Sequence, residues 1–338
     1  MTRYGTIAAT LVALVLGSSG PAQADPVADF YRGKTVNVLI GVAPGGEYDL
    51  HARLVARYIG KYIPGNPTVV PQNMTGAGGL RMANYLYEVA PKDGTAIGML
   101  ANTFPAMQAV GIGGIQFDAA KFNWIGSISP TVETMAVWKT AGVKTIEEAR
   151  TKEVVAGATG RGAITYMLPA MLNEVLGTKF KIVTGYPGGN NVNLAMERGE
   201  VAARNNTWSS WKVTKPDWLR DKEITILVQA GPKAKDLPDV PSVEDLVKTG
   251  DERQLVNLIV SGTRLGRPLA TTPGVPAERV QALRDAFDAV MKDPAFLKEA
   301  EAGNIEVDPV RGVELQRVVE EVLATPQHVK DRARPIFE

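Results

Sequence analysis

Two glycine-rich turns are the segments of this chain whose residue types and spacing indicate a binding site. The first turn, residues 44–49, follows the β-branched run 36–42, the second turn, residues 159–163, follows the run 154–157, and each precedes an amphipathic segment. Glycine lets the backbone approach a ligand closely, and the free N–H groups and positive dipole of a helix N-terminus attract an anion. Two such turns favour an anion site, although similar turns in other α/β proteins often bind nothing. The candidate contacts are Pro44, Gly45, Gly46, Glu47, Tyr48, Asp49, Thr159, Gly160, Arg161, Gly162 and Ala163.

Two charged residues in these turns each allow two interpretations. Asp49 either complements the N-terminus of its own helix, where a carboxylate is favourable, or contacts a water, a hydroxyl or an ammonium group of the ligand. Arg161 either supplies a bidentate cation to a carboxylate or is a solvated loop cation. The sequence leaves both pairs of alternatives open.

Polar amides and one tryptophan add further candidate contacts. Asn73, in the glycine-containing stretch 72–79, carries both donor and acceptor groups. Asn190 opens a helical segment, where its alternative role is N-capping. Trp208, in the mixed run 204–211, either lines the site, which would favour an aromatic or longer aliphatic acid, or packs in a core. The remaining candidates are Gly78, Asn102 and Asn206.

The elements that would position these residues alternate along the chain. Short β-branched runs predict strands and amphipathic runs predict helices. Their alternation is typical of α/β layers on largely parallel sheets. We predict strands at residues 35–42, 67–72, 96–100, 123–128, 135–138, 154–157, 181–184 and 224–229, and helices at 50–62, 80–89, 163–176, 190–198, 277–291, 294–302 and 310–323.

Composition excludes several classes of site. The 338 residues include 37 Lys and Arg against 36 Asp and Glu, so the basic excess of a nucleic-acid-binding surface is missing. Without cysteine there is no thiolate catalysis, and the two histidines, His51 and His328, lack the spacing of a zinc motif. The sequence also contains no nucleophile elbow, P-loop or H-E-x-x-H motif. The length of the chain favours two domains. From the missing residues and motifs we expect no enzymatic activity, no metal and no cofactor.

The first 24 residues predict an export signal. Arg3 precedes an uncharged apolar stretch at residues 7–16, and small residues lead to Ala22, Gln23 and Ala24, as in a cleavable signal peptide. The apolar stretch is about half as long as the ~20 residues of a membrane-spanning helix. We expect cleavage after Ala24 and a periplasmic mature protein.

Several short motifs follow one another in a fixed order along the chain. They are FYRGK at 30–34, PGG at 44–46 with Asp49, Ala52 and Arg53, VVPQN at 69–73, GAGG at 76–79, PKDGT at 91–95, GYPGG at 185–189, LAMERGE at 194–200, LPDVP at 237–241 and PGVPAERV at 273–280. In this combination the chain resembles the extracytoplasmic receptors of tripartite tricarboxylate transporters, also called the Bug family. Family members often have serine at the position of Ala163 and acidic or other polar residues near Asn205 and Asn206, so ligand specificity cannot be transferred from them.

The resemblance implies a type II periplasmic binding-protein fold, with two α/β lobes, mainly parallel sheets and a ligand cleft between the lobes. Residues 1–24 would be the signal peptide, 27–130 with 235–338 lobe one, and 131–234 lobe two. The implied function is a monomeric receptor that captures a small organic carboxylate, such as a di- or tricarboxylate or an aromatic acid, and delivers it to membrane permease subunits. An alternative is a receptor for amino acids or other solutes of an ATP-driven transporter or a sensor-kinase system, in which Glu47 or Asp49 would bind an ammonium group.

Overall fold

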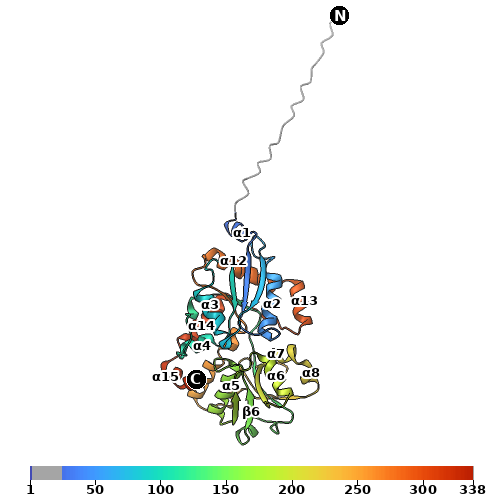
Figure 1. Ribbon diagram of the computed structural model, residues 1–338, viewed down its shortest axis with the longest axis vertical. Coiled ribbons are helices and arrows are strands. Elements are labelled where there is room, and N and C mark those ends of the chain that lie inside the picture. Colours follow the sequence, from blue (N-terminus) through green and yellow to red (C-terminus); the bar gives the residue numbers. More distant parts are fainter. Residues whose placement is uncertain (2–24, 338) are drawn as a thin grey trace.

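The chain folds into two lobes that are stacked along the long axis of the molecule, each built on one β-sheet (Figure 1). The computed structural model describes Met1 and residues 25–337. Residues 2–24, on which the predicted export signal falls, lie outside the described residues. None of the helices in the described part of the chain is long and apolar enough to cross a membrane.

The first lobe has a six-stranded sheet in the order β11-β4-β10-β3-β1-β2. β1 pairs in parallel with β2 and β3, and β10 runs antiparallel to both β3 and β4. The strands are β1 Thr35–Ile40, β2 Thr68–Asn73, β3 Ala96–Met99, β4 Asn123–Ser127, β10 Leu269–Thr271 and β11 Val310–Arg311. Around them lie α1 Pro26–Tyr31, α2 Glu47–Ile59, α3 Leu80–Glu88, α4 Phe104–Ala109, α12 Ala277–Val290, α13 Pro294–Ala302 and α14 Gly312–Leu323 (Figure 1).

The second lobe has a five-stranded sheet in the order β7-β6-β8-β5-β9. β6 pairs in parallel with β7 and β8, whereas β5 runs antiparallel to β8 and β9. The strands are β5 Glu133–Trp138, β6 Val154–Gly157, β7 Phe180–Val183, β8 Ala203–Thr207 and β9 Ile224–Ala230. The remaining α-helices are α5 Ile164–Leu176, α6 Gly189–Glu197, α7 Trp208–Thr214, α8 Pro216–Arg220, α9 Val243–Leu246, α10 Gly250–Ile259, α11 Gly262–Leu265 and, at the end of the chain, α15 Gln327–Phe337.

The predicted two-lobed α/β class is confirmed, but both sheets are mixed rather than mainly parallel. In the first lobe, β10 arrives from the other lobe and inserts between β3 and β4 in the opposite direction. In the second lobe, β5 enters directly from β4 and runs against its neighbours. Parallel pairing needs a long crossover connection, usually a helix. Strands that enter a sheet directly from the other lobe lack this connection, and they pair antiparallel.

Two segments cross between the lobes side by side. Residues 128–132 connect β4 to β5, and the Thr131 N–H donates to the Thr263 carbonyl of the returning segment (2.8 Å). Gly266 follows with a φ of +64°, and a Cβ at this position would overlap the Ser129 carbonyl oxygen. The close approach of the two crossings therefore requires glycine here.

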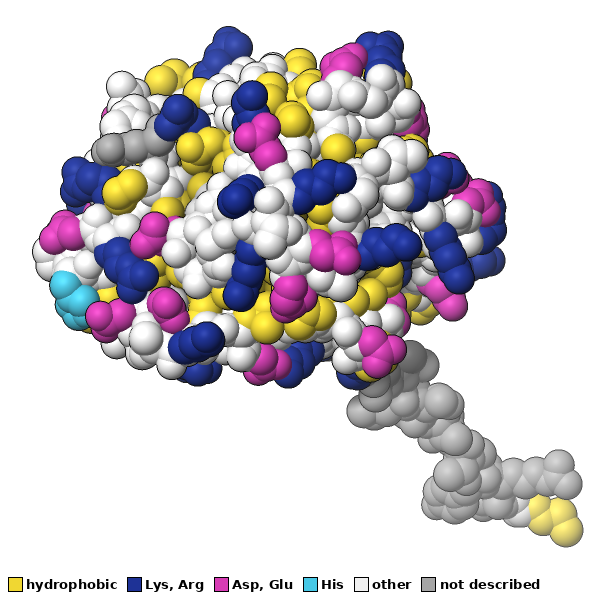
Figure 2. Space-filling view, turned by 90° about the horizontal axis from the view of Figure 1, so that it is seen from below, with side chains coloured by type: hydrophobic (Ala, Val, Ile, Leu, Met, Phe, Trp, Pro, Cys, Tyr) yellow, Lys and Arg dark blue, Asp and Glu magenta, His cyan; other side chains and the backbone are white. Residues whose placement is uncertain are grey.

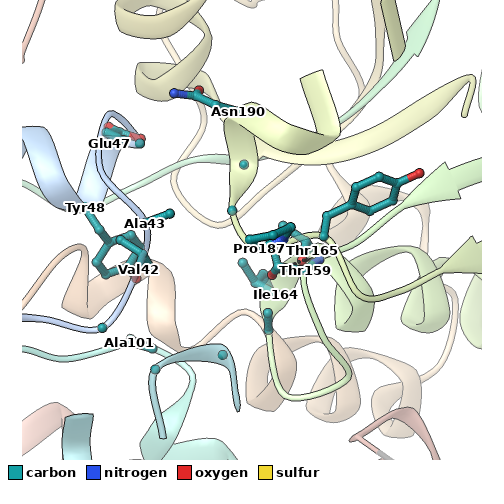
Figure 3. Close-up of a pocket in the computed structure, with 18 of the residues that line it drawn as sticks. Val42, Ala43, Glu47, Tyr48, Ala101, Thr159, Ile164, Thr165, Pro187 and Asn190 are labelled. Atoms are coloured by element: carbon teal, nitrogen blue, oxygen red, sulfur yellow. Dashed lines mark hydrogen bonds between the residues drawn. The ribbon is translucent and has the colours of Figure 1, made fainter. Parts of the chain in front are cut away.

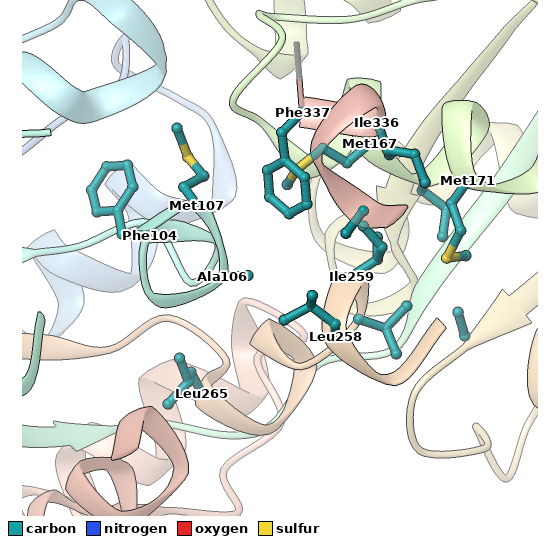
Figure 4. Packing of buried hydrophobic residues seen from close by; sticks show 14 of the residues in the cluster. Phe104, Ala106, Met107, Met167, Met171, Leu258, Ile259, Leu265, Ile336 and Phe337 are labelled. Atoms are coloured by element: carbon teal, nitrogen blue, oxygen red, sulfur yellow. The ribbon is translucent and has the colours of Figure 1, made fainter. Parts of the chain in front are cut away.

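Two helices of the C-terminal third of the chain pack on the second lobe. α10 and α15 contact each other, and both contact α5. Figure 4 shows the side chains of Leu258, Ile259 and Phe337 next to Met167 in one apolar cluster. The predicted lobe one, 27–130 with 235–338, includes both helices. We propose to count α10 and α15 with lobe two, and the other lobe bounds stay a prediction.

Charges of both signs are mixed on the end of the molecule seen in Figure 2. Lys and Arg side chains alternate there with Asp and Glu, and hydrophobic atoms are scattered between them. This distribution agrees with the nearly equal numbers of basic and acidic residues in the sequence. On this face, no patch of one sign points to a polyanionic partner.

Candidate functional site

A cavity of about 410 Å³ lies between the lobes. Glu47 and Tyr48 of the first lobe lie opposite Thr159 and Pro187 of the second (Figure 3). This volume is in the range of small-molecule sites. The lining comes from residues within 41–48, 75–79 and 99–103 of the first lobe, within 159–165, 185–191 and 204–207 of the second, and from Met82, Glu133, Ser210, Thr214 and Arg267.

Four helices begin at this cavity, two from each lobe. α2 and α3 begin after Gly46 and Gly79, and α5 and α6 begin after Ala163 and Gly188; all four of these N-cap residues line the cavity. No described side chain caps any of the four helices. The first N–H groups of a helix have no intrahelical partner, and its dipole is positive at this end. The cavity therefore has hydrogen-bond donors and positive potential on both sides.

The first glycine-rich turn is held from behind by Asp49 and Asn73. Asp49 accepts hydrogen bonds from the Gly45 N–H (2.9 Å), from Arg53 Nε (2.9 Å) and from Asn73 Nδ2 (2.9 Å). Asn73 Nδ2 also donates to the Val42 carbonyl (2.9 Å). Burial raises the pKa of Asp49, but these hydrogen bonds outweigh it and hold the pKa below its ordinary value. Asp49 is therefore fully engaged in shaping the turn, and it does not line the cavity.

Glu47, the first residue of α2, joins the two lobes. It forms a buried ion pair with Arg267, its Oε2 accepts from Thr207 Oγ1 (2.7 Å), and its Oε1 accepts from Ser209 Oγ (2.7 Å). Burial raises the pKa of Glu47, but the cation and the hydroxyl groups hold it below the ordinary value. Burial lowers the pKa of the neighbouring His51 to about 4, so this ring is neutral at neutral pH. Both oxygens of Glu47 are occupied by protein groups.

A second buried carboxyl group, that of Glu133 on β5, also lines the cavity. Among the described residues only Asn205 Nδ2 donates to it, at 2.8 Å from Oε2. The buried Arg204 donates instead to the Gly189 carbonyl (2.6 Å) and to Asn193 Oδ1 (2.5 Å). Burial raises the pKa of Glu133 and lowers that of Arg204 to about 10. Glu133 is thus a buried carboxyl group without a direct cationic partner.

Side-chain contacts join the lobes on two sides of the cavity. Thr103 Oγ1 of the first lobe donates to the Gly162 carbonyl of the second (3.1 Å). Asn190 Nδ2 of α6 donates to the Gly45 carbonyl of the first turn (2.8 Å). The second turn is itself held by Thr165, whose Oγ1 accepts from the Thr159 N–H (3.1 Å). These bonds describe a cleft whose two walls are in contact.

The structure brings most of the predicted contacts to one cavity. Trp208 is not among them, because its Nε1 donates to Asp236 (2.7 Å) and Lys212 lies over its ring. The exposed Arg161 also points elsewhere, with its guanidinium group over the ring of Tyr166. The predicted residues that line the cavity are Pro44, Gly46, Glu47, Tyr48, Gly78, Asn102, Thr159, Ala163, Asn190 and Asn206. Those that do not line it are Gly45, Asp49, Asn73, Gly160, Arg161, Gly162 and Trp208.

Three charged residues at the cavity were not singled out from the sequence. Glu133 and Arg267 are isolated charges in apolar or extended segments, and neither has a motif around it. Arg204 lies in the mixed run 204–211, from which only Asn206 and Trp208 are candidate contacts in the sequence. None of the three lies within a predicted strand, so no local signal in the sequence indicated that these charges are buried.

The described residues contain no group of three or more His, Cys, Asp or Glu side chains that could hold a metal ion. The cavity instead offers backbone N–H groups, hydroxyl groups, amides and two arginines. These groups are suited to hydrogen bonding of an anion.

Comparison with known proteins gives relatives along almost the whole chain. No family model matches it. It is 26% identical over 310 residues to a curated protein of Agrobacterium vitis, the UPF0065 protein in the TAR-I ttuE-ttuC' intergenic region, with 89% of this chain and 83% of the relative covered.

Solved structures of periplasmic binding proteins have the same fold. BugD matches with a TM-score of 0.72 and 18% identity, covering 90% of this chain and 98% of BugD. An R. palustris protein with adipate matches with a TM-score of 0.70 and 20% identity (89% and 97% covered). MatC from Rhodopseudomonas palustris with bound malate matches with a TM-score of 0.68 and 19% identity, covering 90% of this chain and 99% of MatC. These likenesses show a periplasmic binding-protein fold, and together with the curated relative they confirm the resemblance inferred from the sequence.

Proposed function

We propose that this chain is the extracytoplasmic receptor of a tripartite tricarboxylate-type transporter and that it captures a small organic carboxylate in the cleft between its lobes. The observation that carries the proposal is the convergence of α2, α3, α5 and α6, whose uncapped N-termini face one cavity. A carboxylate held there would accept hydrogen bonds from N–H groups of both lobes. Closure around it removes water, which strengthens these charge-assisted hydrogen bonds.

The proposal includes export and delivery. The signal segment would be cleaved after Ala24, and the mature receptor would act as a monomer in the periplasm and pass its ligand to the permease subunits. Similarity to periplasmic binding proteins over nearly the whole chain supports this placement. It also supports a binding protein that needs no cofactor and catalyses no reaction.

The alternative, an amino-acid receptor, would have to use Glu133, which lines the cavity without a direct cationic partner. Such a receptor needs a free carboxylate for the ligand's ammonium group. Glu47 is already paired with Arg267 and two hydroxyl groups, and Asp49 is bonded behind the turn. Neither of the two acidic residues considered from the sequence is therefore available to a cation.

A thermal-shift screen of residues 25–338 tests the proposal. At a ligand concentration a hundred times its dissociation constant, binding to the folded state alone adds about 2.7 kcal/mol of stability. We expect adipate, malate or another mono-, di- or tricarboxylate to raise the melting temperature. Gly46→Leu should abolish this shift, because Gly46 lines the cavity with an ordinary φ of −80° and open space at its Cβ. A response to amino acids or sugars with none to carboxylates would contradict the proposal.

The residues behind the first turn should affect affinity without touching the ligand. Asn73→Ala removes the hydrogen bonds that Asn73 donates to Asp49 and to the Val42 carbonyl and the one that it accepts from Arg53, each worth about 0.5–1.5 kcal/mol or more. We expect roughly tenfold weaker carboxylate binding in calorimetry, because the turn loses its fixed shape. The control is Gln72→Ala on the same strand; among the described residues, the Gln72 side chain bonds only to Asn37. Equal affinities of the two variants would show that the turn keeps its shape without Asn73.

A further inference from the structure

We propose that Glu133 takes part in ligand capture in its protonated form, donating a hydrogen bond to the anionic group of the ligand, so that binding of the carboxylate takes up one proton from solution. This inference rests on the proposed function, since it concerns the same cleft. It assigns a role to a buried acidic group that neither the sequence motifs nor the helix N-termini explain.

The surroundings of Glu133 disfavour its charged form. Its side chain is buried, with the residue 1% exposed, at the wall of the cavity. Arg267 is engaged by Glu47, and Arg204 donates to Gly189 and Asn193. The single hydrogen bond from Asn205 is the only one that the carboxyl group receives from described residues. A buried carboxylate with so little compensation is costly, and protonation relieves this cost.

Arrival of an anionic ligand would favour the protonated form of Glu133 further. The ligand carboxylate would enter the same cavity, where the low dielectric makes repulsion between two carboxylates strong. Protonation of Glu133 removes the repulsion and turns an acceptor into a donor. The unpartnered Nδ2 of the buried Asn206 lies in the same wall and supplies a further donor. The wall then offers hydrogen-bond donors to the ligand rather than a negative charge.

Four groups near Glu133, namely Glu47, Tyr48, His51 and Arg204, have pKa values that lie away from neutral pH. The charged and titratable groups that interact with it are Glu47 and Tyr48 of α2, Arg204 of β8 and Arg267 of the crossing segment, and His51 lies next to Glu47 (3.5 Å). The pKa of Glu47 lies below its ordinary value, that of His51 is about 4, that of Tyr48 about 12 and that of Arg204 about 10. Glu133 is the carboxyl group of this set whose pKa burial raises, so it is the candidate that would take up the proton.

The test is calorimetry with adipate between about pH 6.5 and 8.5, in buffers of different ionisation enthalpy. Free carboxyl groups titrate near 4, so the ligand stays ionised in this range. For the unchanged protein we expect uptake approaching one proton per adipate and an affinity that rises up to about tenfold per unit fall in pH. Glu133→Gln keeps an acceptor for Asn205 but cannot titrate, and it should show neither effect. Glu301→Gln, at an exposed position of α13, should behave like the unchanged protein.

Three outcomes would overturn the inference. These are binding that does not depend on pH, binding that weakens as pH falls, and proton uptake that survives in Glu133→Gln. If adipate does not bind at all, the proposed function fails for this acid, but Glu133 can still be tested. The proton titration curves of the ligand-free protein and of Glu133→Gln should then differ by one proton that titrates at a pH above the ordinary pKa range of glutamate. A difference within that range would also overturn the inference.

Discussion

Replacing Ala163 with aspartate is expected to weaken carboxylate binding by more than about 100-fold while stabilising the free protein. Ala163 is the N-cap of α5, it has extended backbone angles, and it lines the cavity. An aspartate side chain there would accept hydrogen bonds from the free N–H groups at the N-terminus of α5. Such a cap is worth about 1 kcal/mol. The ligand would lose these donors, worth about 1.5–3 kcal/mol for each hydrogen bond to a charged group, and would meet a like charge.

Asparagine at the same position separates charge from geometry. Ala163→Asn caps the helix almost as well as aspartate but carries no charge, so it should stabilise the free protein and weaken binding less than Ala163→Asp. Thermal unfolding without ligand and calorimetry with adipate measure the two effects. Unchanged affinity in Ala163→Asp would show that the ligand does not use the N-terminus of α5.

Replacing Arg267 with methionine is expected to destabilise the protein by about 3–5 kcal/mol, the usual cost of leaving one partner of a buried ion pair alone. Glu47 and Arg267 are both buried, with 5% and 4% of their surface exposed. Without Arg267, the Glu47 carboxylate keeps only its hydroxyl partners and the neutral His51. Urea unfolding at neutral pH measures the loss of free energy of unfolding.

The double variant and a surface pair provide the controls. Glu47→Gln combined with Arg267→Met should recover most of the stability, since no buried charge is left unpaired. Arg264 lies three residues before Arg267 and forms an exposed ion pair with Glu321. Arg264→Met breaks this pair and should change stability little. A loss in Arg264→Met as large as in Arg267→Met would show that the effect does not come from burial of the charge.

The stability that the Glu47–Arg267 pair contributes should also depend on pH. The pKa of Glu47 is lower in the folded protein than its ordinary value. The contribution is therefore present above the ordinary pKa of glutamate, about 4.3, and is lost as pH falls through the folded pKa. In acid unfolding, the double variant should consequently lack the part of the pH-dependent loss of stability that comes from Glu47.

Every strand and helix predicted from the sequence overlaps an element of the structure, because hydrophobic periodicity is a local property. The strands that were not predicted are β8, β10 and β11. β8 contains Arg204, Asn205 and Asn206 at its centre, and asparagine disfavours strands. They are tolerated there because Asn205 and Arg204 bond within the cleft. α10 also went unpredicted, although Thr249 and Glu252 form a capping box that the sequence displays.

Local patterns in the sequence determined the α/β class, the two glycine-rich turns and their use as helix N-termini, since turn chemistry and periodicity depend on neighbouring residues. The two lobes were implied by the resemblance to the receptor family. Only the tertiary structure decided which residues reach the cavity. Asp49 and Asn73 support the first turn from behind, whereas Glu133, Arg204 and Arg267 meet Glu47 at the cleft. Residues this far apart in the chain come together through the packing of the lobes, and no local pattern records this packing.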